Sequence, residues 1–230
     1  MRKDASHRSE LINQLVYGEQ FSIILDHPEW IFIKSISDGY EAWIENRPDT
    51  FSDSMGSNDT NIITSFLAEI QIDQHRIKIP IGSLVDPISM QIITGSHVDS
   101  LSLSEALSQV YDQLSGAPYL WGGRTGFGID CSGLSQLVYR IVGIQLPRDA
   151  ALQCQQGFDL FFGQQQFGDL LFYKNKQDQI IHVALVKDTN HVIHASGFVR
   201  KDRYDEKGIY NETLKTYTHS FAFAKRITGP

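Results

Sequence analysis

The residues of this chain that could carry out nucleophilic chemistry include one cysteine at a conspicuous position. Cys131 follows a glycine-rich stretch, residues 119–129, and precedes an apolar run with helical spacing, residues 134–142. The first amides of a helix lack internal partners and carry partial positive charge, so a thiol there is biased toward the nucleophilic thiolate. Free cysteines are also common as small buried apolar residues, and for Cys131 taken alone this alternative stays open.

Two histidines further along the chain could supply the base and the orienting group that a thiol nucleophile needs. His182 and His194 lie in two apolar segments, and the turn residues between them indicate a β-hairpin. If the turn is centred near Asp188, both histidines lie on one face as direct cross-strand neighbours about 5 Å apart. Each could be a satisfied core residue, but two facing histidines are costly unless hydrogen-bonded. A nucleophile, a base and an orienter, in the order of papain, would explain all three.

The same residue types could hold a metal, but their spacing favours none. The chain has neither a paired-cysteine motif nor a His-Glu-x-x-His motif, and His191 and His194 point to opposite faces of a strand. The glycines between 122 and 128 lack the Lys-Ser/Thr ending of a phosphate loop and the spacing of a dinucleotide loop. They indicate close backbone packing or access to the thiol. We expect no metal and no cofactor.

Length and composition are those of an ordinary globular chain. Its 230 residues, 41% hydrophobic and 20% charged, suffice for one substantial core or two small ones. A formal net charge of −7 without a basic cluster gives no indication of nucleic acid or an anionic membrane as a partner. Cys131 and Cys154 alone do not make a disulfide framework. Without a long apolar run or an apolar leader at residues 1–9, we expect a cytoplasmic protein.

The remaining segments predict two domains, residues 1–97 and 98–230. The first is predicted to be a small antiparallel barrel with strands at 21–25, 30–36, 40–45, 62–72, 76–80 and 90–94, and with a long loop at 46–59. The second begins with a helix over 101–114, for which Ser102 or Ser104 is the expected cap. It continues with the helix after Cys131, a helix over 149–156, and strands at 169–173, 180–186, 191–195 and 221–226. This order predicts an α+β domain.

Several motifs together resemble the NlpC-type cell-wall cysteine peptidases. The similarity runs from about Ser104 to Arg226 and is carried by Pro118-Tyr-Leu-Trp-Gly-Gly123, Asp130-Cys-Ser-Gly-Leu134, Leu146-Pro-Arg-Asp149, Gly168-Asp-Leu170, His182-Val-Ala184 and Ile193-His-Ala195. The resemblance implies a papain-like α+β fold with Cys131 as nucleophile, His182 as base and His194 as its orienter. It also implies that Tyr119 helps the Cys131 amide to hold an oxyanion, although Tyr119 could equally be a packing residue.

The front half resembles the bacterial SH3-like barrel of γ-D-glutamyl-L-diamino-acid endopeptidases. The similar segments are Ser9-Glu-Leu-Ile-Asn-Gln-Leu-Val-Tyr-Gly-Glu19 and Asp38-Gly-Tyr-Glu-Ala-Trp-Ile44. The resemblance implies that the barrel restricts one end of the cleft, that Glu10, Tyr40 and Asp149 bind a substrate ammonium, and that Asp130 and Ser132 also line the substrate site. A desolvated ammonium needs such acceptors. Alternatively, Glu10 is merely solvated, Tyr40 is barrel core, and Asp149 caps a helix.

The function implied by these resemblances is hydrolysis of the bond between γ-D-glutamate and an L-diamino acid, either meso-diaminopimelate or lysine. The substrates would be short murein peptides with a free N-terminal L-alanine, cleaved during cell-wall peptide recycling. Alternatives are a lytic endopeptidase or amidase that acts on intact peptidoglycan, and a non-catalytic wall-binding module. An intact cysteine and histidine set argues against the binding module. Relatives often carry two barrels, whereas residues 1–97 accommodate one, so the free-amine requirement depends most on this half.

Overall fold

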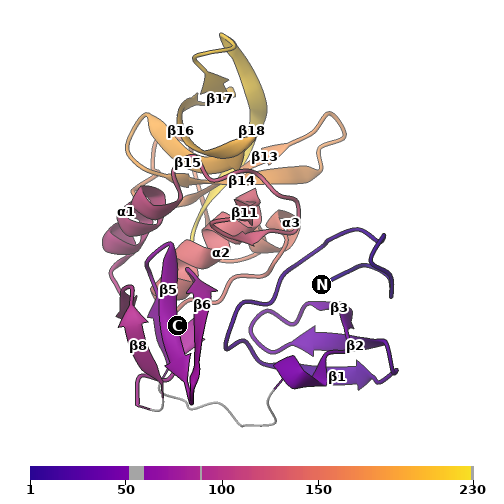
Figure 1. Cartoon of the computed structure of the whole chain (residues 1–230). Coiled ribbons are helices and arrows are strands. Elements are labelled where there is room, and N and C mark those ends of the chain that lie inside the picture. The colour runs from indigo at the N-terminus through magenta and orange to yellow at the C-terminus, as the bar shows by residue number, and fades with distance from the viewer. Residues whose placement is uncertain (52–59, 89, 229–230) are drawn as a thin grey trace.

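The computed structural model describes residues 1–51, 60–88 and 90–228, and Figure 1 shows a strand-rich front half beside a mixed second half. The predicted loop at 46–59 falls partly outside this range. Its described beginning contains the short 3-10 helix η1 (Pro48–Thr50), and residues 52–59 lie outside the described residues. None of the helices in the described ranges has the length and hydropathy of a bilayer-spanning segment.

Three strands near the N-terminus form an antiparallel sheet in the order β1-β2-β3. Its central strand alternates in burial, with Ile31 and Ile33 almost completely inside, because successive side chains of a strand point to opposite faces. The strands are β1 (Phe21–Leu25), β2 (Trp30–Ser35) and β3 (Glu41–Glu45). All three strands predicted for this segment are therefore present.

A second group of strands, lying beside the first in Figure 1, forms two further three-stranded sheets, β7-β4-β9 and β6-β5-β8. The strand predicted over 62–72 is divided in two, because the backbone turns away at residues 64–66. The strands are β4 (Asn61–Ile63), β5 (Leu67–Ile72), β6 (His75–Pro80), β7 (Leu84–Val85), β8 (Gln91–Thr94) and β9 (His97–Val98). The antiparallel front half is as predicted, but its described strands fall into three sheets. The boundary after residue 97 stays a prediction.

The second half begins with helices that pack against a sheet. Helix α1 (Leu103–Leu114) is capped by Ser102, whose hydroxyl accepts from the Glu105 amide while Glu105 reaches back to the Ser102 amide. Helix α2 (Cys131–Ile141) is buried along its whole length. Helix α3 (Ala150–Gln153) is shorter than the predicted 149–156. The small hairpin of β10 (Arg124–Thr125) and β11 (Gly128–Ile129) precedes α2.

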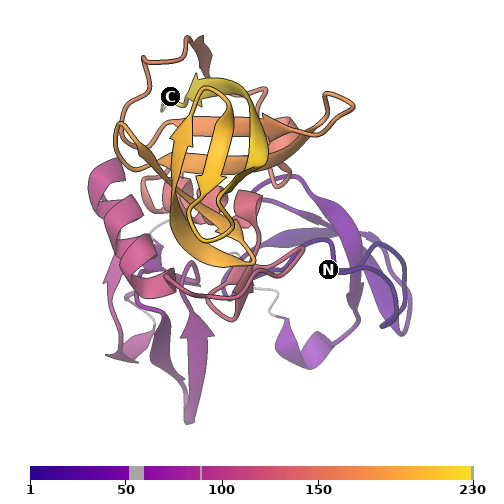
Figure 2. The same ribbon diagram turned by 90° about the horizontal axis from the view of Figure 1, so that it is seen from above.

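The sheet behind α2 is antiparallel and closes on itself. Its order is β12-β18-β13-β14-β15-β16-β17, and β17 also pairs with β18, so six strands form a closed barrel, part of which Figure 2 shows from above. The strands are β12 (Phe158–Leu160), β13 (Leu170–Lys174), β14 (Ile180–Val186), β15 (His191–Ser196), β16 (Phe198–Asp205), β17 (Gly208–Asn211) and β18 (Thr216–Arg226). The α+β class is confirmed, and β12, β16 and β17 are additional to the prediction.

One apolar core joins α2 to this sheet. It contains Leu134, Leu137, Val138, Val183, Leu185 and Ile193, all nearly inaccessible to solvent. Each such side chain contributes roughly 1.5–3 kcal/mol when it leaves water. The core therefore fixes the first turn of α2, which begins with Cys131, against strands β14 and β15, which carry His182 and His194.

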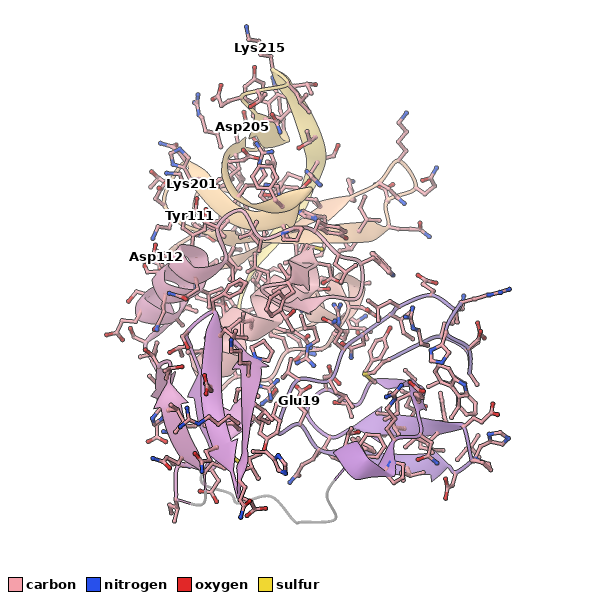
Figure 3. The ribbon with its side chains drawn as sticks, viewed as in Figure 1. Glu19, Tyr111, Asp112, Lys201, Asp205 and Lys215 are labelled. Atoms are coloured by element: carbon pink, nitrogen blue, oxygen red, sulfur yellow. The ribbon has the colours of Figure 1, made fainter. Side chains whose placement is uncertain are left out.

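A buried ion cluster ties the front half to the second half. Glu19 has no exposed side-chain surface and pairs with Arg124, at 2.8 Å, and with Arg140 of α2. It lies where the front half meets the second half (Figure 3). The Gln14 side chain accepts from the Arg124 amide at 2.7 Å. Gly122 lets the Leu11 backbone lie close to the second half. Its φ is +77°, and an added Cβ would lie 2.8 Å from the Leu11 carbonyl oxygen.

Candidate active site

Cys131 is the first residue of α2, as predicted, and Asp130 caps the helix by accepting from the Gly133 amide at 2.8 Å. Cys131 is only 6% exposed, and the backbone amides of Val183 and Ser132 lie close enough to its thiol to lower the pKa. Val183 directly follows His182 on β14. The sulfur therefore lies against the part of the sheet that carries the expected base.

The protonation state of Cys131 differs from the expectation of a thiolate. Burial, and secondly the nearby Asp130 carboxylate, raise the pKa of the Cys131 thiol to about 11, against the weaker opposing effects of the two amides and Arg148. The helix start supplies donors, but loss of hydration disfavours the charged form more strongly. At neutral pH the resting nucleophile is a neutral thiol that must lose its proton during the reaction.

Asp130 and Ser132, expected in the substrate site, are buried and already engaged within the protein. The Asp130 carboxylate accepts from Arg148 and from the Gly122 amide at 2.8 Å. The Ser132 hydroxyl contacts Asp130 at 3.2 Å and accepts from Arg148 at 2.8 Å. These contacts give both residues a structural part in shaping the loop around the thiol and leave no free carboxylate for a substrate ammonium.

His182 and His194 face each other, but the predicted register of their hairpin is wrong by one residue at the turn. Leu185 pairs with Ile193 and Val186 with Val192, which centres the turn at residue 189 rather than near Asp188. The two histidines are on one face as diagonal neighbours instead of direct ones. Their rings are long enough to bridge the diagonal, and His182 Nε2 lies 2.9 Å from His194 Nδ1.

The histidine pair continues to a carboxylate that sequence reasoning missed. His194 Nε2 lies 3.1 Å from Oδ2 of Asp202 on β16, and Arg200 Nη2 donates to the other carboxylate oxygen at 2.8 Å. Burial alone would raise the pKa of Asp202, but the hydrogen bonds from His194 and Arg200 hold it below the ordinary value. Asp202 is therefore an ionised acceptor within a buried network.

This chain of contacts fixes the proton on each ring. Because the Asp202 carboxylate can only accept, His194 carries its proton on Nε2 and presents a lone pair at Nδ1. His182 must then donate from Nε2, which leaves its Nδ1 as the proton acceptor. Burial, together with His219 and His194, lowers the pKa of His182 well below its usual value, so the ring is neutral at pH 7. A neutral base on the strand whose next residue, Val183, lies against a neutral thiol is suited to proton abstraction in step with nucleophilic attack.

A third imidazole, His219 of β18, completes the cluster and was not among the predicted site residues. Its ring stacks on His182 with centroids 4.1 Å apart and an interplanar angle of 27°. The His194 ring is 5.6 Å away and perpendicular. Desolvation, with a smaller contribution from His194, lowers the pKa of His219 to about 4. Three imidazoles with lowered pKa values therefore meet on strands β14, β15 and β18 of the barrel.

Tyr119 is half-buried close to the thiol. Burial, and then the proximity of Cys131 and Asp130, raise the pKa of the Tyr119 phenol far above its ordinary value. Its backbone is held at the sheet edge, because its amide donates to the Gly197 carbonyl at 2.9 Å. The phenol thus keeps its proton and can donate it, which an oxyanion role requires.

Two of the three residues predicted to bind a substrate ammonium, Tyr40 and Asp149, lie close to each other, and Asp38 lies near both. Burial and the neighbouring Asp149 raise the pKa of Tyr40. The pKa of Asp149 is raised by partial desolvation and by two other carboxylates, Asp130 and Asp38, against the effect of Arg148. Asp149 stands at the start of α3 but makes no side-chain cap hydrogen bond, so its carboxylate is available. These residues make a partly hydrated acidic site, and a bound cation would offset the repulsion between its carboxylates.

Glu10 does not share this environment. Its side chain is exposed, and it is not among the groups that shift the pKa of Tyr40 or Asp149. Asp38 is the front-half carboxylate that lies near Tyr40 and Asp149. Its Oδ1 accepts from the Tyr40 amide at 3.1 Å, and its Oδ2 accepts from Gln136 of α2 at 3.2 Å. The sequence could have indicated Asp38, since Asp38 and Tyr40 lie in the same turn before β3.

The chain is similar to known proteins in both halves. Residues 116–218 match the NlpC/P60 family, and residues 1–47 match the bacterial dipeptidyl-peptidase SH3 domain. The probable endopeptidase NlpC of Escherichia coli is 34% identical over 133 residues, which cover 56% of this chain and 81% of that protein. The γ-D-glutamyl-L-lysine dipeptidyl-peptidase of Bacillus cereus is 38% identical over 82 residues, which cover 35% of this chain.

The two comparisons differ in how much of the relative is matched. The match spans only 25% of the length of the Bacillus cereus enzyme, and 28% of a similarly named Bacillus subtilis enzyme. A crystal structure of an NlpC/P60 family protein from Bacillus cereus has the same overall fold, with a TM-score of 0.74 over 94% of this chain and 81% of that one. Its sequence identity is 17%, so this likeness concerns the fold alone.

Proposed function

Since the chain belongs to the NlpC/P60 family, we propose that it is a cysteine peptidase that cleaves the γ-D-glutamyl to L-diamino-acid bond of short murein peptides. The family matches and the similar crystal structure confirm the family and the fold that the motifs predicted. The observation that carries the catalytic part of the proposal is the contact chain from His182 through His194 to Asp202, beside a buried thiol at a helix start. A purely binding module would not need this chain.

The proposed reaction starts from neutral Cys131 and neutral His182. As the sulfur attacks the γ-carbonyl carbon, its proton passes to His182 Nδ1, and the carbonyl π electrons move onto oxygen. The Cys131 amide and the Tyr119 hydroxyl are the donors for that oxyanion. The new imidazolium of His182 is stabilised by the negative charge of Asp202, which lies on the other side of the His194 ring.

Collapse of this intermediate releases the diamino acid. The carbonyl re-forms, the C–N bond breaks, and His182 gives its proton to the departing amine, which leaves a thioester on Cys131. The same nitrogen then takes a proton from water, whose oxygen attacks the thioester carbon. The C–S bond breaks, the thiol regains the proton, and L-Ala-D-Glu leaves. Apart from water, every group in these steps belongs to the chain or to the substrate.

The proposed substrates have a free N-terminal L-alanine. Support comes from the site formed by Tyr40, Asp38 and Asp149, where a cation would offset the neighbouring carboxylates that raise the pKa of Tyr40 and Asp149. A blocked or extended N-terminus would leave these groups desolvated and unpaired. Peptides of this kind are fragments rather than intact wall, and we therefore propose a recycling role in the cytoplasm. Lysine or meso-diaminopimelate is proposed for the third position.

Mass spectrometry of three incubations tests the proposal. The purified protein is given L-Ala-γ-D-Glu-meso-diaminopimelate or its lysine analogue, the N-acetylated tripeptide, and intact peptidoglycan, with Cys131→Ala as the control enzyme. We expect L-Ala-D-Glu from the free tripeptide alone. Fragments released from intact wall would replace the recycling role by a lytic one. No cleavage of any substrate would favour the wall-binding alternative and overturn the proposal.

A further inference from the structure

His219 has no part in the thiol chemistry, yet its ring lies against the catalytic base. One nitrogen from each of His182, His194 and His219 lies within 4.8 Å of the other two. We propose that these three histidines form a binding site for a divalent first-row metal ion, Zn²⁺ in particular, and that binding of the ion switches the peptidase off. The inhibitory consequence rests on the proposed function, whereas the binding site itself does not.

The outer nitrogens of two of these rings are already held as they are in metal sites. A histidine that binds a metal usually donates its other N–H to a carboxylate, a carbonyl or another acceptor. His194 Nε2 faces Asp202 at 3.1 Å, and His219 Nδ1 lies 2.9 Å from the Thr218 hydroxyl, which can itself donate to the Ile209 carbonyl at 3.5 Å. His194 Nδ1 and His219 Nε2 are left with lone pairs as possible ligands.

The ligand type points to the kind of metal. The cluster offers three imidazole nitrogens, all within 4.8 Å of one another. Imidazole is a ligand that Zn²⁺ and related first-row ions prefer, whereas Mg²⁺ and Ca²⁺ prefer oxygen.

The geometry needs a small adjustment. Tetrahedral zinc with bonds of about 2.0–2.1 Å places its ligand nitrogens roughly 3.4 Å apart. The nitrogens of His182 and His194 are 2.9 Å apart, so this pair has to open slightly, and His219 has to turn out of its stack on His182 to close the site. His219 is half-buried near the start of β18 and is the ring with the most room to move. Because this movement of the rings costs part of the binding free energy, we expect the metal to bind reversibly.

Metal binding would inactivate the base for a definite reason. A metal can bind His182 Nε2 only after this nitrogen has lost its proton to solvent, and Nδ1 of the same ring then takes a proton from solvent, so that the ring stays neutral. Nδ1 then has no lone pair to accept the Cys131 proton. The hydrogen bond to His194 Nδ1 is lost as well, because the metal occupies that nitrogen. Without that acceptor the thiol keeps its proton, and its attack on a carbonyl is suppressed.

Isothermal titration calorimetry with Zn²⁺ tests the site without reference to peptidase activity. The titration uses the Cys131→Ala protein, so that the thiol cannot contribute, and compares it with the Cys131→Ala/His219→Phe and Cys131→Ala/His191→Phe proteins. Phenylalanine keeps a stacking ring but offers no ligand. His191 is the matched control, because it lies on β15 but outside the cluster and contacts Asp188. Melting curves check folding, and His219→Gln replaces His219→Phe if that variant is unfolded.

We expect one Zn²⁺ per chain, with a Kd raised at least tenfold by His219→Phe and unchanged by His191→Phe. No binding, or equal binding by the His219 and His191 variants, would overturn the site. In the active protein, Zn²⁺ should inhibit cleavage, and EDTA should reverse the inhibition. The factor by which Zn²⁺ slows cleavage should be at least tenfold smaller in His219→Phe than in the parent protein. A bound ion with undiminished cleavage would overturn the inhibitory role. If no peptide is cleaved at all, the proposed function fails and the calorimetric result still decides the site.

Discussion

Asp202 lies 3.1 Å from Nε2 of His194, the nitrogen on the far side of the ring from His182. The carboxylate therefore acts on the base through an intervening ring. It sets which nitrogen of His194 carries the proton and, through that choice, leaves His182 Nδ1 free to accept one. Asp202 is a positioning residue, because it contacts the orienter and not the reacting atoms.

Replacing Asp202 by asparagine tests this relay. The amide can donate as well as accept, so it permits the opposite tautomer of His194, and it no longer stabilises a positive charge. We expect kcat to fall at least tenfold with KM nearly unchanged, measured with the free tripeptide. Asp205→Asn is the control, because Asp205, which Figure 3 labels, lies on the same strand, is exposed and accepts a hydrogen bond from the Tyr217 hydroxyl. Equal effects of the two variants on kcat would contradict the relay.

Removing the thiol should abolish turnover with little effect on stability. Cys131→Ala deletes the atom that forms the thioester but keeps a small apolar side chain at the start of α2. We expect no cleavage of the free tripeptide above background and a melting temperature within a few degrees of the parent protein. Cys154→Ala should keep the parent activity, since Cys154 is a partly exposed thiol whose sulfur contacts the Ala151 carbonyl. Hydrolysis retained by Cys131→Ala would refute the mechanism.

The pKa of Cys131 makes its alkylation strongly dependent on pH. The thiol loses its proton only as the pH rises toward about 11, because burial and then Asp130 disfavour the thiolate. Iodoacetamide reacts with thiolates, so its rate with Cys131 should rise about tenfold per pH unit between pH 7 and 10. Mass spectrometry of a Cys154→Ser protein follows this single thiol. A rate that levels off below pH 8 would show a stabilised thiolate instead.

The sequence was sufficient for those parts of the site that lie on regular, apolar elements. Cys131 could be placed at a helix start, because a helical run follows it directly. His182 and His194 could be placed on one face of a hairpin, because both strands are almost wholly apolar. Their register could not be predicted to the residue, since it depends on the loop in which the amides of Lys187 and Asp188 both donate to the His191 carbonyl.

Asp202 and His219 could not be found in this way, for a physical reason. Strand β16 has few apolar residues, and its inward-facing Asp202 finds its partners in Arg200 and His194 rather than in a core. A search for alternating apolar residues does not detect such a strand. His219 is in a similar position, since β18 is mostly exposed over its first four residues. Functional polar residues break the pattern by which elements are recognised.

Glu19 should be essential for joining the two halves of the chain. Glu19→Gln would leave Arg124 and Arg140 buried without a counter-charge, and breaking such a cluster typically costs about 3–5 kcal/mol. We expect a loss of this size in the free energy of unfolding, measured in urea at pH 7. Glu29→Gln, in an exposed turn, is the control and should have little effect.

The pH dependence of this loss follows from the charge of Glu19. Burial alone would raise its pKa, but Arg124 and Arg140 outweigh burial and hold the pKa below the ordinary value of 4.5. A lowered folded-state pKa gives stability that is fully present above pH 4.5 and is lost as the pH falls through the folded-state value. The difference between parent and Glu19→Gln should therefore shrink below pH 4.5. A difference that grows in acid would contradict this account.

Asp149 should determine how strongly the peptidase prefers a free N-terminus. Its carboxylate shares the site with Asp38 and Tyr40, and a substrate ammonium would offset the repulsion between the two carboxylates. We expect kcat/KM of the parent to fall at least tenfold when the substrate alanine is N-acetylated, because a charge-assisted contact is lost. Asp149→Asn should reduce this ratio toward one, mainly by slowing the free peptide. Asp159→Asn, on β12, pairs with Lys225 and should keep the parent ratio. If Asp149→Asn keeps it too, the ammonium is bound elsewhere.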